Sequence, residues 1–351
     1  MAINTALTRR LELMSPIIQG PFGGGLSTPR LTATVSNAGG LGSYGAYTLS
    51  PSQIEGVANE IRQLTSRPFA LNLWVIDHDP GGLTLSREQF ARVCRIFEPY
   101  FKELGVAVPE MPQRYHHPFA EQVEAVLEAR PAVFSFVFGV PSTAILAECR
   151  KRGIITIGAA TSVAEAQCLA SAGVDMVVAT GFEAGGHRPA FLTPAEESLM
   201  GTFALTQIAA DRVDIPVIAA GGIVDARGIS AAITLGAQGV QIGTAFLACE
   251  ESGTTPEHRA ILFSERAHHT VLTRAFTGRL ARGVPNRWVD EMSSRLNELP
   301  PFPIRSWFMA KLKSAAAASA RTDVVALWAS QTAPNLRHKT AHELMEALAT
   351  H

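Results

Sequence analysis

The feature that most constrains the fold of this chain is a series of short apolar runs, each followed by a segment with helical periodicity. This alternation is typical of parallel strands joined by crossover helices, and several runs are apolar throughout, as strands covered on both faces are. The predicted strands are Pro16–Gln19, Leu41–Tyr44, Phe69–Leu73, Val133–Phe136, Ile154–Ile157, Met176–Ala179, Pro216–Ala219 and Gly239–Ile242. Eight parallel strands can close on themselves, so we expect an α/β fold with a TIM-like (β/α)8 barrel; an open doubly wound sheet is the alternative.

The 351 residues exceed the ~250 of a typical barrel, so additions to it are expected. We assign residues 1–249 to the barrel, with an insertion at about 75–117 that carries an amphipathic helix over Ser86–Leu104. Beyond residue 249 the strand pattern ends and prolines interrupt the chain. We therefore predict a smaller, mainly helical cap over residues 250–309, without clear strands, and C-terminal helices over 310–351 that pack on the barrel.

Composition excludes several classes of partner. Lys and Arg number 30 against 31 Asp and Glu, and no basic cluster is present that would hold nucleic acid or an anionic membrane. No apolar run reaches the ~18 residues of a membrane span, and we expect a cytoplasmic protein. The four cysteines form no CxxC pair, so no metal site or disulfide framework is predicted.

A GxGxxG pattern occurs at Gly40–Gly45. It indicates dinucleotide binding only where it leaves a strand and opens a helix. Here a helix-like segment, Pro29–Asn37, precedes the pattern, and the predicted strand lies inside it. We therefore interpret the glycines as a tight helix-to-strand turn that lets two backbones approach each other.

Two later loops are better candidates for binding a phosphate. The seventh predicted strand ends in Gly221-Gly222, with a helix from about Asp225, and the eighth ends in Gln241-Ile242-Gly243-Thr244. In barrels of this kind a phosphate often lies between these two loops, where glycine exposes N–H groups and a helix N-terminus favours negative charge. The alternative is two turns that merely need small residues.

The segment after the sixth predicted strand, Gly181–Arg188, holds the candidate catalytic residue, His187. It lies among glycines at the same end of the barrel as the phosphate loops, and imidazole is well matched to proton transfer near neutral pH. Glu183 could orient His187 or pair with Arg188. The other histidines are predicted to be structural or exposed.

Two further groups of polar residues are candidates for ligand contacts. Asn72 is polar among apolar neighbours at the end of the third predicted strand, where its carboxamide could bind a ligand or cap the loop. Arg282 and Arg287 lie in the predicted cap and could hold an anionic substrate. A solvated surface with local ion pairs is the alternative for these arginines.

Taken together, the motifs resemble those of the nitronate monooxygenase family, formerly called 2-nitropropane dioxygenases, and specifically its class I. The matching segments are Pro16–Pro21, Ser36–Gly42, Val133–Pro141, Glu183–His187, Ala219–Ile223, Gln241–Thr244 and Ala281–Arg287. The resemblance implies a barrel with non-covalent FMN that oxidises alkyl nitronates with molecular oxygen, yielding nitrite and a carbonyl product.

Carried over by motif, the catalytic histidine is His187. The implied FMN-binding residues are Pro21, Phe22, Gly23, Asn72, Thr180, Gly185, Gly221, Gly222, Gln241, Ile242, Gly243 and Thr244. Thr180 stands where many members have Gln. The segment Phe302–Trp307, with Lys311 beyond it, lacks the tyrosines and the aligned lysine of class I, so a different substrate pocket is expected.

The expected partners are a small nitronate or nitroalkane and molecular oxygen. Whether the protein forms a homodimer is left open. Two other functions remain as alternatives. One is an NAD(P)H-dependent FMN reductase of enoyl thioesters or quinones; the other is a non-catalytic FMN-binding protein.

Overall fold

The centre of the molecule is a barrel of parallel strands, described here from a computed structural model that covers residues 4–76 and 84–349. In spatial order the sheet runs β1-β9-β8-β6-β5-β4-β3-β2, and a bridge between Ile18 and Leu41 joins its two ends. Its strands are β1 (Ile17–Gln19), β2 (Gly42–Gly45), β3 (Phe69–Trp74), β4 (Val133–Val137), β5 (Ile155–Ala160), β6 (Met176–Thr180), β8 (Val217–Ala220) and β9 (Gly239–Ile242). The predicted strands and the (β/α)8 barrel are confirmed.

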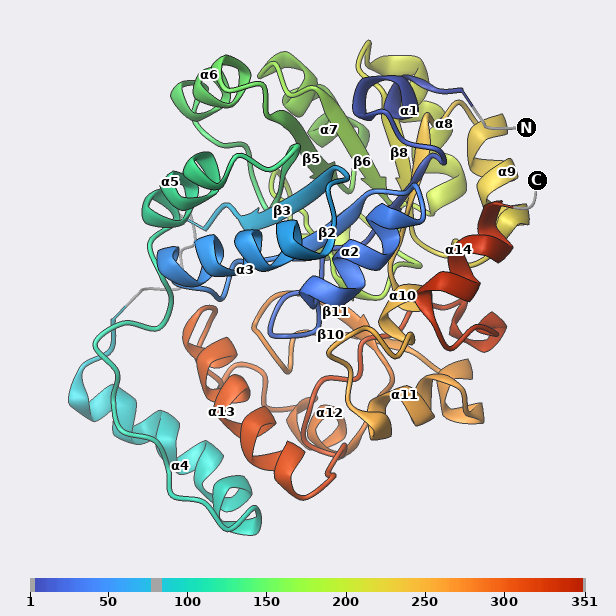
Figure 1. Ribbon diagram of the computed structural model, residues 1–351. Coiled ribbons are helices and arrows are strands. Elements are labelled where there is room, and N and C mark those ends of the chain that lie inside the picture. The colour runs from blue at the N-terminus through green and yellow to red at the C-terminus, as the bar shows by residue number, and fades with distance from the viewer. Residues whose placement is uncertain (1–3, 77–83, 350–351) are drawn as a thin grey trace.

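Helices cover the outside of this barrel (Figure 1). They are α2 (Pro29–Asn37), α3 (Pro51–Leu64), α5 (Phe119–Ala129), α6 (Thr143–Lys151), α7 (Val163–Ser171), α8 (Thr202–Arg212), α9 (Ala226–Thr234), α10 (Thr244–Leu247) and α14 (Ala341–Ala349). The first helix, α1 (Ala6–Leu11), closes one end of the barrel instead, where Leu7 and Leu11 pack in a core with residues of the strands. Side-chain caps fix several helix starts: Ser50 begins α3 through a capping box with Gln53, and Asp225 accepts from the Gly228 N–H at the start of α9. Short 3₁₀ turns lie at Ala195–Glu197, Glu265–His268 and Ala333–Asn335.

The glycines of the GxGxxG pattern allow close backbone contact, as the sequence interpretation holds. The pattern runs into β2 and opens no helix. A side chain at Gly42 would collide with the Thr32 carbonyl of α2, and one at Gly45 would collide with the backbone of Phe22. Both positions therefore require glycine for packing, and the strand is held against the helix that precedes it.

A second body packs beside the barrel mouth. The insertion forms α4 (Arg87–Glu103), which lies away from the barrel at the lower left of Figure 1, alongside α13 (Ile304–Ala318). With α12 (Arg287–Met292) they share a core of their own, in which Phe97 stacks on Phe308 at 4.7 Å between ring centroids. The division predicted at residue 310 falls inside α13, and α14 packs against α2 and α9.

The prediction that the cap has no strands is wrong. After α11 (Pro256–Leu262), the strands β10 (Val271–Thr273) and β11 (Ala281–Gly283) form an antiparallel sheet with β7 (Gly186–His187). Each of these strands has at most three residues, too few to produce an alternating pattern. The third strand comes from the loop that carries His187, so this sheet joins the cap to the predicted catalytic segment.

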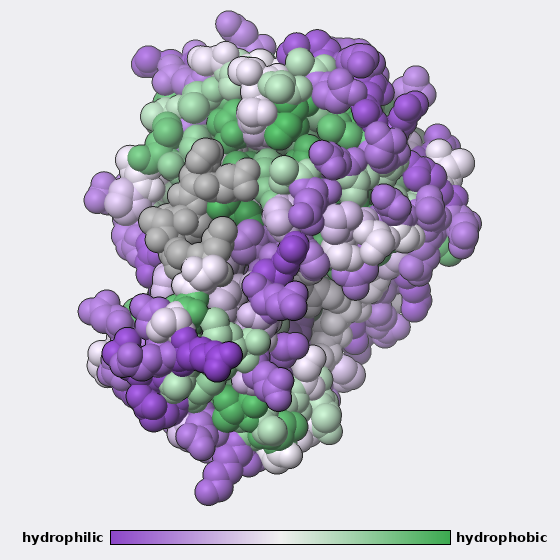
Figure 2. Space-filling model, turned by 90° about the vertical axis from the view of Figure 1, so that its left-hand side faces the viewer, coloured by the Kyte–Doolittle hydropathy of each residue, from purple (hydrophilic) through white to green (hydrophobic). Residues whose placement is uncertain are grey.

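Among the described residues, no helix is long and apolar enough to cross a membrane. On the face shown in Figure 2, apolar side chains are interspersed with hydrophilic ones.

Candidate active site

A cavity opens where the barrel strands end and the loops after them begin. Its volume is about 200 Å³ and it is open to solvent, and it lies where barrels of this kind bind their ligands. The predicted cofactor residues on its wall are Pro21, Phe22, Gly23, Asn72, Thr180, Gly185, Gly221, Gly222, Gln241, Gly243 and Thr244. Ile242 is different: its side chain is fully buried in the core behind β9.

The two glycine loops supply backbone donors to this wall. Gly221 and Gly222 have φ values of +110° and +68°, which favour glycine. The N–H groups of Gly222, Ile223, Gly243 and Thr244 donate to no acceptor in the described part of the chain, and all four residues line the cavity. No Lys, Arg, Asp or Glu is among the described residues on the wall, so an anion there would be held by backbone dipoles.

His187 lies on the cavity wall, held between the barrel and the cap. Its strand β7 pairs with β11, and its Nε2 lies 2.8 Å from the Thr277 hydroxyl oxygen. The rings of Trp74 and Trp328 pack on the imidazole at 4.8 and 5.1 Å between centroids. Burial, and to a lesser extent the positive charge of Arg279, lower the pKa of His187 to about 3. The imidazole is therefore neutral at neutral pH and can accept a proton or a hydrogen bond.

The loop before His187 is anchored by two charged residues that do not touch the imidazole. The Glu183 carboxylate accepts from the backbone N–H of Thr202 at 3.0 Å and so caps α8. Arg188 is buried and donates to the carbonyl oxygens of Thr180, at 2.6 Å, and Ser198. Glu183 therefore neither orients His187 nor pairs directly with Arg188; both side chains hold the loop in place instead.

An aromatic wall beside His187 was missed in the sequence. Trp74 stacks on Tyr47 with ring centroids 3.8 Å apart, and Phe138 packs on its edge. Trp74 lies two residues after Asn72 on the same face of β3, so strand alternation could have found it. Trp328 lies in an irregular segment, where the sequence gives no such signal.

Asn72 and Arg282 both make contacts within the protein. Asn72 Nδ2 donates to the Ser135 hydroxyl at 3.0 Å while its side chain lines the cavity. Arg282 is buried in β11, where its Nε donates to the Phe182 carbonyl at 2.9 Å and its guanidinium lies over the Phe182 ring. Arg282 is not on the cavity wall, and this placement speaks against its predicted contact with substrate.

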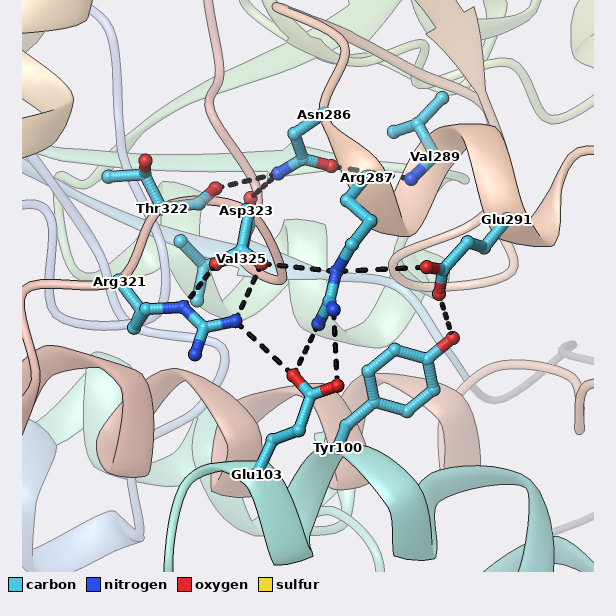
Figure 3. A network of polar contacts seen from close by, with 10 residues as sticks. All are labelled: Tyr100, Glu103, Asn286, Arg287, Val289, Glu291, Arg321, Thr322, Asp323 and Val325. Atoms are coloured by element: carbon cyan, nitrogen blue, oxygen red, sulfur yellow. Dashed lines mark hydrogen bonds and ion pairs between the residues drawn. The ribbon is translucent and has the colours of Figure 1, made fainter.

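Arg287 lies in an ion network between α12 and α4 (Figure 3). Its guanidinium makes two hydrogen bonds to Glu103, at 2.7 and 3.1 Å, and lies 3.1 Å from Asp323 and 3.7 Å from Glu291. It is not on the cavity wall. This placement speaks against the predicted contact with substrate and favours the ion-pair alternative, in which Arg287 joins the insertion to the cap.

Comparison with known proteins agrees with this architecture. A profile described as nitronate monooxygenase matches residues 4–351. A protein of Staphylococcus saprophyticus named "Probable nitronate monooxygenase" is 37% identical over 99% of this chain and 97% of its own. A protein of the same name from Staphylococcus aureus strain Newman is 38% identical over 93% of this chain and 91% of its own.

Solved structures agree as well. The nitroalkane oxidase of Streptomyces ansochromogenes superposes with a TM-score of 0.87 at 32% identity, covering 98% of this chain and 97% of that one. FabK of Thermotoga maritima superposes with a TM-score of 0.74 at 28% identity, covering 99% and 95%. The match over almost the whole chain places this protein in the nitronate monooxygenase family.

Proposed function

We propose that this protein binds FMN and uses molecular oxygen to oxidise alkyl nitronates, giving nitrite and a carbonyl product. Family membership supports the reaction class. The observation that carries the proposal is one cavity lined both by His187, which is neutral, and by two glycine loops whose backbone donors have no acceptor among the described residues.

The cavity has features that suit both the phosphate and the flavin ring of FMN. Four N–H groups, of Gly222, Ile223, Gly243 and Thr244, have no acceptor among the described residues and could hold a phosphate. A Cβ added at Gly243 would meet only the Phe22 ring, at 3.9 Å, so that position leaves open space beside the donors. Apolar rings elsewhere on the wall suit a flavin ring.

Polar side chains on the same wall could bind the edges of the flavin. Asn72, Thr180 and Gln241 come from three different strands, β3, β6 and β9. Bound FMN would supply the redox chemistry, taking electrons from the substrate and passing them to oxygen. The protein supplies position, desolvation and proton transfer.

His187 is the group available for proton transfer. On a neutral nitroalkane its free nitrogen would take the proton from the carbon beside the nitro group. The C–H bond breaks, its electron pair stays on the substrate as a nitronate, and an imidazolium forms. The desolvation that lowers the pKa of His187 would be offset by the nitronate charge beside it. A substrate supplied as nitronate skips this step.

The test is an aerobic nitrite assay on purified protein with a panel of small nitronates, with and without NAD(P)H. We expect yellow protein that releases FMN on denaturation and forms nitrite with oxygen alone. Bleaching of the flavin by NAD(P)H without nitrite formation would favour a reductase. Flavin binding with neither activity would favour a non-catalytic binding protein. Colourless protein that gives no saturable spectral shift with added FMN would end the proposal.

A further inference from the structure

The polar contact that His187 makes through its ring is to Thr277, in the loop between β10 and β11. The hydroxyl oxygen lies 2.8 Å from Nε2, and the threonine is 8% exposed. No hydrogen bond to Nδ1 occurs within the described residues, and the imidazole lines the cavity. The two nitrogens therefore differ: Nε2 contacts a protein hydroxyl, and Nδ1 has no hydrogen-bond partner within the described residues.

The Thr277 hydroxyl has two further neighbours, both on the backbone of Arg279. Its oxygen lies 3.3 Å from the Arg279 N–H, which donates to it, and 3.4 Å from the Arg279 carbonyl, to which it can donate. A hydroxyl donates one hydrogen bond and accepts two. The direction of the bond to His187 therefore decides whether the hydroxyl proton goes to the imidazole or to the carbonyl.

Counting bonds favours one arrangement. If Nε2 carries the proton, the hydroxyl accepts from Nε2–H and from the Arg279 N–H and donates to the Arg279 carbonyl, and three bonds form. If Nδ1 carries the proton, the hydroxyl must donate to Nε2 and the contact with the carbonyl is lost. Because unmade bonds at buried groups are costly, the first arrangement is the more stable.

We infer that Thr277 is a positioning residue that holds His187 as the Nε2–H tautomer, so that Nδ1 is its basic nitrogen in the cavity. The hydroxyl acts through the imidazole and does not touch the substrate. The consequence for catalysis rests on the proposed function: a base that removes a carbon proton needs a bare nitrogen facing that carbon. The tautomer itself can be measured without any activity.

The first experiment is NMR of the FMN-loaded protein labelled with ¹⁵N at histidine, at neutral pH. The couplings of each ring nitrogen to the carbon-bound protons show which nitrogen carries the proton. The His187 signals are the set missing in His187→Asn, among the ten histidines of the chain. We expect Nε2–H in the wild type and in Thr277→Ser, and a mixture of tautomers in Thr277→Val, which keeps the shape but lacks the hydroxyl.

The second experiment is kinetic, on a neutral nitroalkane. Thr277→Val should lower kcat about 3- to 10-fold, the effect of one hydrogen bond, with KM and FMN content little changed. Thr277→Ser should restore most of the activity. Thr206→Val is the matched control, because Thr206 is a buried threonine in α8 whose hydroxyl has no partner in the described part of the chain.

Nδ1–H in the wild type, or an unchanged tautomer in Thr277→Val, would overturn the inference, and the wild-type spectrum decides even if the variant fails to fold. A wild type with the Nε2–H form but no nitrite formation would refute the proposed function and leave the tautomer assignment standing.

Discussion

Two regions of the molecule place a nitrogen-containing side chain against aromatic side chains, in opposite electrostatic settings: His187 lies against Trp74 and Trp328, and Arg287 lies over the ring of Tyr100. In the cavity, burial dominates and drives the pKa of His187 down to about 3, so the side chain is neutral. In the network between α4 and the cap, hydrogen bonds with Arg287 and Arg321 lower the pKa of Glu103, and its carboxylate stays charged. The first setting suits proton transfer, and the second suits holding two segments together.

Exposure explains the difference. The side chains of Arg287 and Glu103 are 34% and 43% exposed, so water stabilises their charges. The polar partners drawn in Figure 3 stabilise them as well. His187 is partly buried, with the rings of Trp74 and Trp328 packed against it, and no carboxylate lines the described wall to favour its charged form. An arginine-rich cap is therefore no sign of an anion site here, because its charges are used within the protein.

The largest change in activity is expected on substitution of His187 in the cavity. His187→Asn should lower the rate with a neutral nitroalkane by about 10²–10⁴-fold, the usual contribution of a general base. The loss on a pre-formed nitronate should be smaller, because that substrate already lacks the proton. Stopped-flow and nitrite assays on FMN-loaded protein measure both. Full nitroalkane activity with FMN retained would remove His187 from the mechanism, and loss of FMN would make it structural.

The next largest effect, on FMN affinity, is expected at the two glycine loops of the cavity. Gly243 has φ −99°, so alanine there adds no left-handed strain, and its Cβ would enter open space beside the free N–H groups. Gly243→Ala should raise the Kd for FMN roughly 10- to 100-fold, as expected for weakening a hydrogen bond to a charged group. Fluorescence titration of the flavin measures it.

The control for this change is Gly56→Ala. Gly56 lies in α3 with nothing within 4 Å of an added Cβ, so FMN affinity should not change. If both variants bind FMN like the wild type, the phosphate does not lie at Gly243.

Of the two regions, the cavity could largely be predicted from the sequence and the ion network could not, for physical reasons. Strands buried on both faces appear as apolar runs, so the barrel and the loops at its mouth were found, among them the segment with His187. The strands β10 and β11 were not found, because three residues cannot show a period. The partner of Arg287, Glu103, lies 184 residues away in sequence, so the arginine pattern could not reveal an ion network.

The pH dependence of the reaction sharpens the electrostatic comparison. The folded pKa of His187 is lowered, so the neutral form is kept as pH falls from 7 until about 3. An ordinary histidine of pKa ~6.5 would be protonated and lose about 30-fold in kcat/KM by pH 5. We expect kcat/KM for a neutral nitroalkane to show no acid limb between pH 5 and 7. A limb near pH 6.5 that disappears in His187→Asn would contradict the burial of this imidazole.

Arg287 should give the smallest effect, and one on stability alone. Arg287→Gln removes the two hydrogen bonds to Glu103 but leaves Arg321 beside the same carboxylate, at 3.3 Å. Because the pair is partly exposed, we expect a loss of about 1 kcal/mol or less in the free energy of unfolding, smaller still in high salt. KM should be equal for neutral and acidic nitronates, since Arg287 is not on the cavity wall.

The control is Arg295→Gln, which breaks an exposed pair with Glu298 in the same cap and should lower the free energy of unfolding by less. Denaturant titration compares the two variants, and a KM raised only for acidic nitronates in Arg287→Gln would return this arginine to the substrate site.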